Sequence, residues 1–417
     1  MVTIREITKG PKHHFFGYYN LCPWNKTEEF LLGLETEFID RHPSKKDAAK
    51  IVLINSKSNQ MEKIASTKAW CWQQSCMLQW MPPYFKENII FNDRMHDKFV
   101  SVILNIKTKK KKIIPFPVFA IHPSGKYGLG LNFSRLNKVR KGYGYEGVKD
   151  PYEKENIPQN EGIHLINFKT KKRKLIVSLK TLSEYNPLET MKNGKHWVDH
   201  IEFNHSGNRF CFFHRWETGG GLFYTRLFTS DIEGKDLHCF PDSGFYSHIK
   251  WKNDLELFGW GSNSKLIGDI RKNKRKFNIL VNLILPIYRK IIPSKLRKKI
   301  LPASYFLWKD KSQKIKKVKI NYEDGHSSFS KKERLLITDT YPNKKGYRNL
   351  ILYDWLKKKK RLLGKFYSIP SKNNIKSLKW GTEGISCDLH PRWDRKGEKI
   401  CIDSVHKSSR QMYVIYL

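Results

Sequence analysis

The chain has 417 residues, of which 39% are hydrophobic and 13% aromatic, enough apolar side chain for a packed core. It contains 79 Lys and Arg against 39 Asp and Glu, a formal net charge of +40. No run of 18 apolar residues occurs, so the sequence predicts no membrane-spanning helix.

The charge predicts an anionic partner, or it reflects a lysine-rich surface. A strongly basic protein attracts acidic polysaccharides, anionic membranes and nucleic acids. The lysine clusters at residues 109–112 and 357–360 lie between strand-like runs, as solvated hairpin turns do, and they form no continuous stripe. We therefore expect an acidic oligo- or polysaccharide as partner and no specific nucleic acid.

The N-terminal residues and the cysteines predict a cytoplasmic protein. Residues 1–6 have no basic stretch followed by an apolar one, so we expect no signal peptide. The seven cysteines are scattered, and the one close pair, Cys71 and Cys76, has no metal-ligand spacing around it. Such cysteines suit a reducing compartment, with or without peripheral attachment to the inner face of the membrane.

Two aromatic, glycine-containing segments are candidates for sugar binding. The first is His-His-Phe-Phe-Gly-Tyr-Tyr-Asn at residues 13–20, and the second covers residues 140–146 with Tyr143 and Tyr145. Glycine lets a loop backbone approach a ligand, and tyrosine rings stack on sugar faces. The alternative is a packed loop that covers one face of the fold.

One strand-turn-strand pattern recurs along the chain. Each copy has an apolar, usually aromatic anchor, then a polar turn, then an apolar strand, and the clearest copy is the last, residues 391–403 followed by residues 411–417. In chain order the seven anchors are Trp24, Trp80, Ile121, Phe203, Trp251, Phe329 and Trp393.

This repeat predicts an all-β fold, a seven-bladed β-propeller in a single domain over residues 1–417. Apolar and polar residues alternate with period 2, which favours strands. A four-stranded blade needs roughly 40–50 residues, so longer gaps between anchors carry insertions. One such unit cannot bury both faces of its sheet, whereas radial stacking of units buries them and protects the edges. Residues 2–4 are expected to supply the outer strand of the last blade.

A histidine register distinguishes the last four repeats from the first three. Three residues before the anchor, the first repeats have apolar residues and the last four have histidine, at His200, His248, His326 and His390. Equivalent positions in consecutive blades converge around the propeller axis. Four imidazoles suit a transition-metal site or proton abstraction. The alternative is a repeat-specific histidine that hydrogen-bonds within its own blade.

Polar residues gather around the same register. They either line one mouth of the channel together or pack singly against their blades. The residues in question are Asp388, Asp199, Arg215, Arg392, Gln73 and Gln74.

A basic insertion interrupts the β pattern at residues 262–310. Within it, residues 277–288 are mostly apolar, but they are too few to span a bilayer and contain Pro286. Cations flank them on both sides, so residues 271–299 are expected to be partly helical. They either lie on an anionic membrane surface or pack as a lid over a blade.

The repeats resemble those of TolB/WD40-like propellers, and residues 197–417 resemble the oligogalacturonate lyases, seven-bladed propeller enzymes that cleave uronate oligomers. The residues that carry this second resemblance are the His-x-x-aromatic motifs at the last four anchors. The segment at residues 13–19 also resembles propeller proteins of bacterial surface-polysaccharide gene clusters.

The resemblance to the lyases implies a site. That family binds manganese through three His and one Gln, with another His as base. By register, His326 and His390 match metal ligands and His248 matches the base, while Arg215 matches an arginine beside it. Asp388 stands where the family has a His, and Ile385 stands near its Gln. These two departures change two of the four manganese ligands that the resemblance implies.

Two functions follow from the sequence. The first is a polysaccharide lyase-like enzyme that performs β-elimination on an acidic glycan. Its metal ion would be held by His326, His390 and Asp388, its catalytic residues are His248 and Arg215, and its substrate-binding residues are His200, Arg392, Tyr143, Tyr145 and Gln74. The second is a non-catalytic propeller that binds glycan or partner proteins at a membrane-associated biosynthetic complex, because propellers are often binding platforms.

Overall fold

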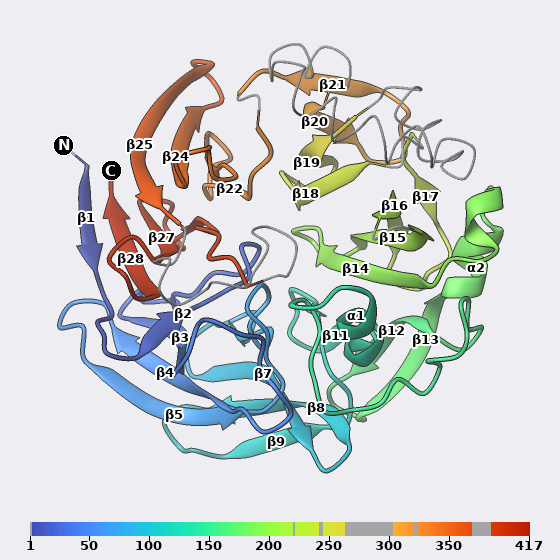
Figure 1. The fold of residues 1–417 in the computed structure, drawn as a ribbon, viewed down its shortest axis with the longest axis horizontal. Coiled ribbons are helices and arrows are strands. Elements are labelled where there is room, and N and C mark those ends of the chain that lie inside the picture. The colour runs from blue at the N-terminus through green and yellow to red at the C-terminus, as the bar shows by residue number, and fades with distance from the viewer. Residues whose placement is uncertain (1, 220–221, 242–244, 263–302, 321–322, 369–384) are drawn as a thin grey trace. The chain divides into compact units, whose positions relative to one another are not determined.

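The structure is a computed structural model and describes residues 2–219, 222–241, 245–262, 303–320, 323–368 and 385–417. The chain divides into two compact units. Unit 1 consists of residues 1–151, 164–174 and 325–417, and unit 2 of residues 152–163 and 175–324. Seven four-stranded sheets make up the chain (Figure 1), and this is the seven-bladed β-propeller that the repeat predicts.

Blades 1 and 2 lie in unit 1, together with the first two strands of blade 3 and parts of its third and fourth strands. Blade 1 is β2 (His13–Phe15), β3 (Phe30–Thr36), β4 (Ala49–Asn55) and β5 (Met61–Thr67). Blade 2 is β6 (Gln79–Trp80), β7 (Asn88–Met95), β8 (Lys98–Asn105) and β9 (Lys111–Ile114). Blade 3 is β10 (Ala120–Ile121), β11 (Tyr127–Gly130), β12 (Gly162–Asn167) and β13 (Lys172–Ser178).

Blades 4 and 5 lie in unit 2, and blades 6 and 7 lie in unit 1. Blade 4 is β14 (His196–Phe203), β15 (Arg209–Gly219), β16 (Leu222–Asp231) and β17 (His238–Cys239). Blade 5 is β18 (Tyr246–Trp251), β19 (Glu256–Gly261), β20 (Ser304–Lys309) and β21 (Ile315–Val318). Blade 6 is β22 (Ser327–Phe329), β23 (Leu335–Asp339), β24 (Tyr347–Asp354) and β25 (Lys359–Tyr367). Blade 7 is β26 (Arg392–Trp393), β27 (Lys399–Ser404), β28 (Gln411–Tyr416) and β1 (Thr3–Glu6).

The seven anchors occupy one equivalent position. Each is the last residue of its blade's first strand, or, in blade 1, an isolated bridge, and each pairs with the start of the second strand. The pairs are Trp24 with Leu31, Trp80 with Ile89, Ile121 with Gly128, Phe203 with Phe210, Trp251 with Leu257, Phe329 with Leu336, and Trp393 with Ile400. The predicted register is therefore confirmed.

The two ends of the chain close blade 7. Strand β1 pairs antiparallel with β28, from Thr3 opposite Tyr416 to Glu6 opposite Tyr413, and Figure 1 shows the blue strand beside the red one. The expectation that the N-terminal residues complete the last blade is confirmed, with β1 covering residues 3–6 where the sequence suggested residues 2–4. An N-terminal strand in the last sheet ties two distant parts of the chain together.

The core of each unit lies between neighbouring blades. In unit 1, Trp24, Trp80 and Met412 belong to one buried cluster that joins blades 1, 2 and 7. In unit 2, Trp251 and Trp308 of blade 5 pack with Phe213 of blade 4. Alternation along each strand sends one set of side chains to each face of a sheet, so a sheet can pack against a neighbouring blade of its unit on each face, as the sheet of blade 1 does in unit 1.

Helices are few in the described part of the chain. They are α1 (Phe133–Val139), α2 (Leu179–Glu184) and the 3₁₀ turn η1 (Glu189–Met191). Side chains of Asn132 and Ser178 cap the first two by accepting from backbone N–H groups. None of the described helices has the length and hydropathy to cross a bilayer. Residues 263–302 of the basic insertion lie outside the described residues, so its partly helical character stays a prediction. The predicted end of the insertion at residue 310 is wrong, because Ser304–Lys309 form strand β20 of blade 5.

Candidate functional site

Three of the four register histidines have an unusual backbone conformation, as does Met77 at the same position before its anchor. Met77, His200, His248 and His390 have φ of 52°, 55°, 46° and 44°. At His200 and His248 the pairing of the first two strands slips by a β-bulge. A bulge re-aims a side chain out of the sheet pattern, and histidine tolerates left-handed φ better than most residues. The local fold therefore sets these side chains apart from the packing faces of their strands.

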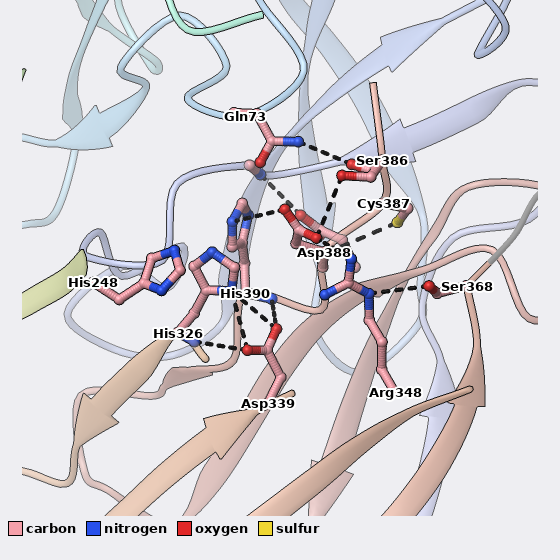
Figure 2. A network of polar contacts seen from close by, with 12 residues as sticks. Gln73, His248, His326, Asp339, Arg348, Ser368, Ser386, Cys387, Asp388 and His390 are labelled. Atoms are coloured by element: carbon pink, nitrogen blue, oxygen red, sulfur yellow. Dashed lines mark hydrogen bonds and ion pairs between the residues drawn. The ribbon is translucent and has the colours of Figure 1, made fainter. Parts of the chain in front are cut away.

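In unit 1, His326, Asp388 and His390 come together. One ligand atom of each lies within 4.8 Å of the others, and all three residues are buried. The two imidazole rings meet edge to face with centroids 4.2 Å apart. His390 Nε2 lies 3.9 Å from Asp388 Oδ2. Figure 2 shows the three side chains facing one another, which confirms that two register histidines of adjacent blades converge.

Asp339 at the end of β23 holds His326. Its carboxylate lies 3.0 and 3.1 Å from His326 Nδ1 and accepts the His326 backbone N–H at 2.7 Å. Burial on its own would lower the pKa of His326, but the Asp339 carboxylate outweighs it and raises that pKa. Glycine at position 325 permits the backbone beside His326 to lie close to Asp339, because a Cβ there would meet the Asp339 carbonyl oxygen at 1.9 Å.

Arg348 of β24 holds Asp388. Its Nη2 forms a very short ion pair with Asp388 Oδ1, while its Nε donates to Ser368 Oγ at 3.0 Å and its Nη1 to the Thr340 carbonyl at 3.1 Å. Both partners of the ion pair are almost fully buried, with side chains 1% and 6% exposed. The guanidinium thus satisfies one carboxylate oxygen, and Asp388 offers the other to the histidines.

The three side chains fit a divalent first-row metal ion in their donor chemistry. Two imidazole nitrogens and one carboxylate oxygen are ligands that such ions accept. Two ligands of one ion lie at most about 4 Å apart at bond lengths of about 2.1 Å, so small side-chain rotations suffice. The proton on His326 Nδ1 faces Asp339, which directs Nε2 to the group. A carboxylate behind a ligating histidine is typical of metal sites.

Gln73 of unit 1 reaches the same segment. Its side chain, 3% exposed, donates from Nε2 to the Ser386 carbonyl at 3.0 Å, two residues before Asp388. Tyr19, from the aromatic segment near the N-terminus, is buried with its ring centroid 5.1 Å from that of His326 and 5.9 Å from that of His390. Part of the first aromatic segment is therefore packing around the histidines.

In unit 2, His200 and His248 each face a carboxylate. His200 Nδ1 lies 2.9 Å from Asp199 Oδ1, and Arg215 Nη1 pairs with the other oxygen of that carboxylate at 2.8 Å. His248 Nδ1 lies 2.8 Å from Asp324 Oδ1. The hydrogen bond with Asp324 fixes the orientation of the His248 imidazole, as the Asp339 contact does for His326 in unit 1.

Three further candidates from the sequence are buried in unit 1. Arg392 is 1% exposed and pairs with Asp403 at 2.9 Å. Burial lowers the pKa of Arg392, and the Asp403 carboxylate more than offsets this, so the pKa is raised. Gln74 is fully buried. Tyr145 stacks on Phe133 with centroids 4.3 Å apart and is 1% exposed, which favours the packed-loop alternative for this residue.

Tyr143 is the more accessible of the two candidate tyrosines. It is half-buried, and the Arg140 guanidinium lies 3.6 Å from the centre of its ring. Cation–π contact covers one face of the ring.

Sequence reasoning missed Asp339 and Arg348, because neither stands in the histidine register. The one available signal was positional: Asp339 stands three residues after Leu336, the strand partner of anchor Phe329. Asn92 and Asp403 stand at the same offset after the partners of Trp80 and Trp393.

The chain matches no protein-family model and no curated protein. Among solved structures it is similar to an oligogalacturonate lyase in complex with manganese, with a TM-score of 0.66 and 9% identity, over 99% of this chain and 93% of that one. It is similar to an oligogalacturonate lyase from Vibrio parahaemolyticus, with a TM-score of 0.62 and 9% identity over 100% and 93% of the chains.

A propeller of different chemistry is also similar. The β-propeller domain of the Trilobed protease from Pyrococcus furiosus gives a TM-score of 0.51 at 10% identity, over 98% of this chain and 94% of that one. At such identities the likeness concerns the fold. Function has to be argued from the side chains of this chain.

Proposed function

We propose that the protein is a lyase-like propeller enzyme that cleaves a uronate-containing glycan by β-elimination. The observation that carries the proposal is the buried group of His326, Asp388 and His390, whose donor atoms suit a divalent metal ion. The fold shared with an oligogalacturonate lyase in complex with manganese supports the same choice of metal and substrate class.

β-Elimination on a uronate places three demands on the protein. The C5 proton, which is α to the carboxylate, passes to a base; the C4–O bond breaks as the C4=C5 double bond forms; and the leaving oxygen takes up a proton. A bound divalent ion supplies positive charge that neutralises the carboxylate and makes the C5 proton more acidic. The side chains of the chain supply the remaining groups.

His248 is the proposed base. With Nδ1 2.8 Å from Asp324 Oδ1, its proton resides on Nδ1 and its lone pair on Nε2. The Asp324 carboxylate also stabilises the imidazolium that forms when Nε2 accepts the C5 proton. Arg215 is the proposed partner of a substrate carboxylate, since a guanidinium binds a carboxylate through two parallel hydrogen bonds.

A second function is favoured by the ion pairs of Arg215 and Arg392, the two arginines that the sequence suggested as substrate-contacting residues. Arg215 is paired with Asp199, and Arg392 with Asp403, so both guanidinium groups are already neutralised by buried carboxylates. Structural ion pairs of this kind suit a rigid platform that binds glycan or partner proteins without turnover. In that case the His326, Asp388 and His390 group holds blades 6 and 7 together.

Metal analysis and lyase assays on the purified full-length protein separate the two functions. We expect Mn²⁺ to bind, and oligogalacturonate or another uronate oligomer to give a product with the ultraviolet absorbance of a conjugated double bond. His326→Ala and His390→Ala should lose the metal and the activity. His248→Ala should keep the metal and lose activity by about 10²–10⁴-fold, the usual contribution of a general base.

His164→Gln is the matched control, because His164 is a buried histidine of unit 1 that lies outside this group. It should retain metal and activity. Binding of uronate oligomers with no metal and no turnover would replace the enzyme with the binding platform.

A further inference from the structure

The carboxylate of Asp339 contacts histidines of two blades. One oxygen accepts the His326 backbone N–H at 2.7 Å, and both oxygens face His326 Nδ1. The second oxygen also accepts the His390 backbone N–H at 3.3 Å. Asp339 is fully buried, and the His326 contacts outweigh the effect of that burial, so the pKa of Asp339 is lowered. It is a charged group in the interior, and these contacts compensate its desolvation.

The position of Asp339 recurs in other blades of unit 1. Asn92 in blade 2 donates from Nδ2 to the Val118 carbonyl and accepts the Val118 N–H, both at 2.9 Å. Asp403 in blade 7 accepts the N–H groups of Phe16 and Gly17 at 3.1 and 2.9 Å. Each of these side chains thus reaches across to the first-strand segment of the next blade. We call this position the clasp.

Asp339 differs from the other two clasp residues in a second contact. Asn92 Oδ1 accepts a hydrogen bond from the Ser101 hydroxyl, and Asp403 forms an ion pair with the Arg392 guanidinium. Asp339 instead receives the imidazole N–H of His326, which belongs to its own blade. The same carboxylate therefore fixes the ring of one candidate metal ligand and the backbone of another.

We propose that Asp339 is the positioning residue of the site: it fixes the Nδ1–H tautomer of His326, so that the Nε2 lone pair faces Asp388 and His390. The inference rests on the proposed function where it concerns metal affinity. A hydrogen bond behind a ligating imidazole sets its tautomer and ring orientation, and loss of such a partner commonly lowers metal affinity 10–100-fold. Asp339 acts through His326 and need not touch metal or substrate.

Mn²⁺ titration of the full-length protein tests the effect on affinity. Asp339→Asn keeps the size of the side chain but leaves one acceptor oxygen in place of two, so we expect Mn²⁺ to bind about 10–100-fold more weakly. Asp403→Asn is the matched control, because it weakens a clasp at the same position in blade 7 and leaves the His326 ring contact intact. It should bind Mn²⁺ as the wild type does. Equal losses in both variants would overturn the inference in favour of a general loosening of the blades.

Nitrogen-15 NMR of histidine-labelled, metal-free protein tests the positioning independently of the metal. At a pH where the imidazole is neutral, His326, identified by its absence in His326→Ala, should show the Nδ1–H tautomer in the wild type and a mixture in Asp339→Asn. If the wild type binds no Mn²⁺ but the tautomer still differs between the wild type and Asp339→Asn, the proposed metal site is refuted and the positioning role of Asp339 is retained. An unchanged tautomer in Asp339→Asn overturns the inference whatever the metal does.

Discussion

Histidines in this protein differ sharply in what surrounds them, and their chemistry differs accordingly. His326 faces a buried carboxylate, and this contact raises its pKa. His164, on β12, is 7% exposed; burial first and the nearby charge of Arg173 second lower its pKa to about 4. The Asp339 carboxylate therefore favours the charged form of the His326 imidazole, whereas burial favours the neutral form of the His164 imidazole.

His164 should make the protein acid-sensitive. Because its folded pKa lies below the ordinary 6.5, its contribution to stability is complete above pH 6.5 and is lost as the pH falls towards 4. A shift of this size corresponds to about 3 kcal/mol of unfolding free energy. His164→Gln should flatten the stability profile in this window, measured by urea denaturation at several pH values. A slope in His164→Gln equal to that of the wild type would contradict the assignment.

At the scale of elements, the join between blade 7 and blade 1 depends on β1. This short strand covers the edge of β28, and Arg5 extends from it to blade 1, where its guanidinium donates to the Ser56 and Lys57 carbonyls and to Asn59 Oδ1. An uncovered strand edge exposes unpaired backbone groups. The strand therefore stabilises blade 7 and links it to blade 1 in unit 1.

Deletion of residues 1–6 should lower the unfolding free energy by about 2–4 kcal/mol, since several backbone hydrogen bonds of about 1 kcal/mol each are lost. The urea midpoint by circular dichroism measures this. Arg5→Ala removes only the link to blade 1, so we expect a smaller shift of the midpoint. If the deletion leaves the midpoint where it is, β1 makes no net contribution to stability.

For the whole molecule, the excess of 40 positive charges concerns partners more than folding. Residues 271–299 contain eleven Lys and Arg and no Asp or Glu. They lie outside the described residues, and the sequence predicts that they either lie on an anionic membrane surface or pack as a lid over a blade. Each cation near such a surface contributes about 1 kcal/mol, an attraction that salt screens.

The full-length protein should sediment with phosphatidylserine vesicles at low salt and detach at high salt. Substitution of Arg271, Lys272, Lys274, Arg275 and Lys276 by Gln should reduce this binding strongly. The control replaces Lys107, Lys109, Lys110, Lys111 and Lys112 of blade 2 by Gln, with the same loss of net charge. Equal effects of both sets would assign the binding to net charge alone and not to the insertion.

The sequence by itself determined the seven repeats, their anchors and the histidine register. The alternation of apolar and polar residues, the turn residues and the anchor at a fixed position are local features, so short stretches of sequence are enough to recognise them. Only the tertiary structure decided which polar groups meet. Asp339 and His390 are 51 residues apart, and Asp403 contacts Phe16 across 387 residues, through the packing of adjacent blades.

Pairing of neighbouring strands within one blade placed Arg392 against Asp403 and, in unit 2, Arg215 against Asp199. Sequence spacing does not specify such pairs, because a buried charge takes whichever partner the neighbouring strand presents. For this reason the fold and two histidines of the candidate metal site followed from the pattern of residues. Asp339, the carboxylate proposed to position the His326 ring, was visible only in the tertiary structure.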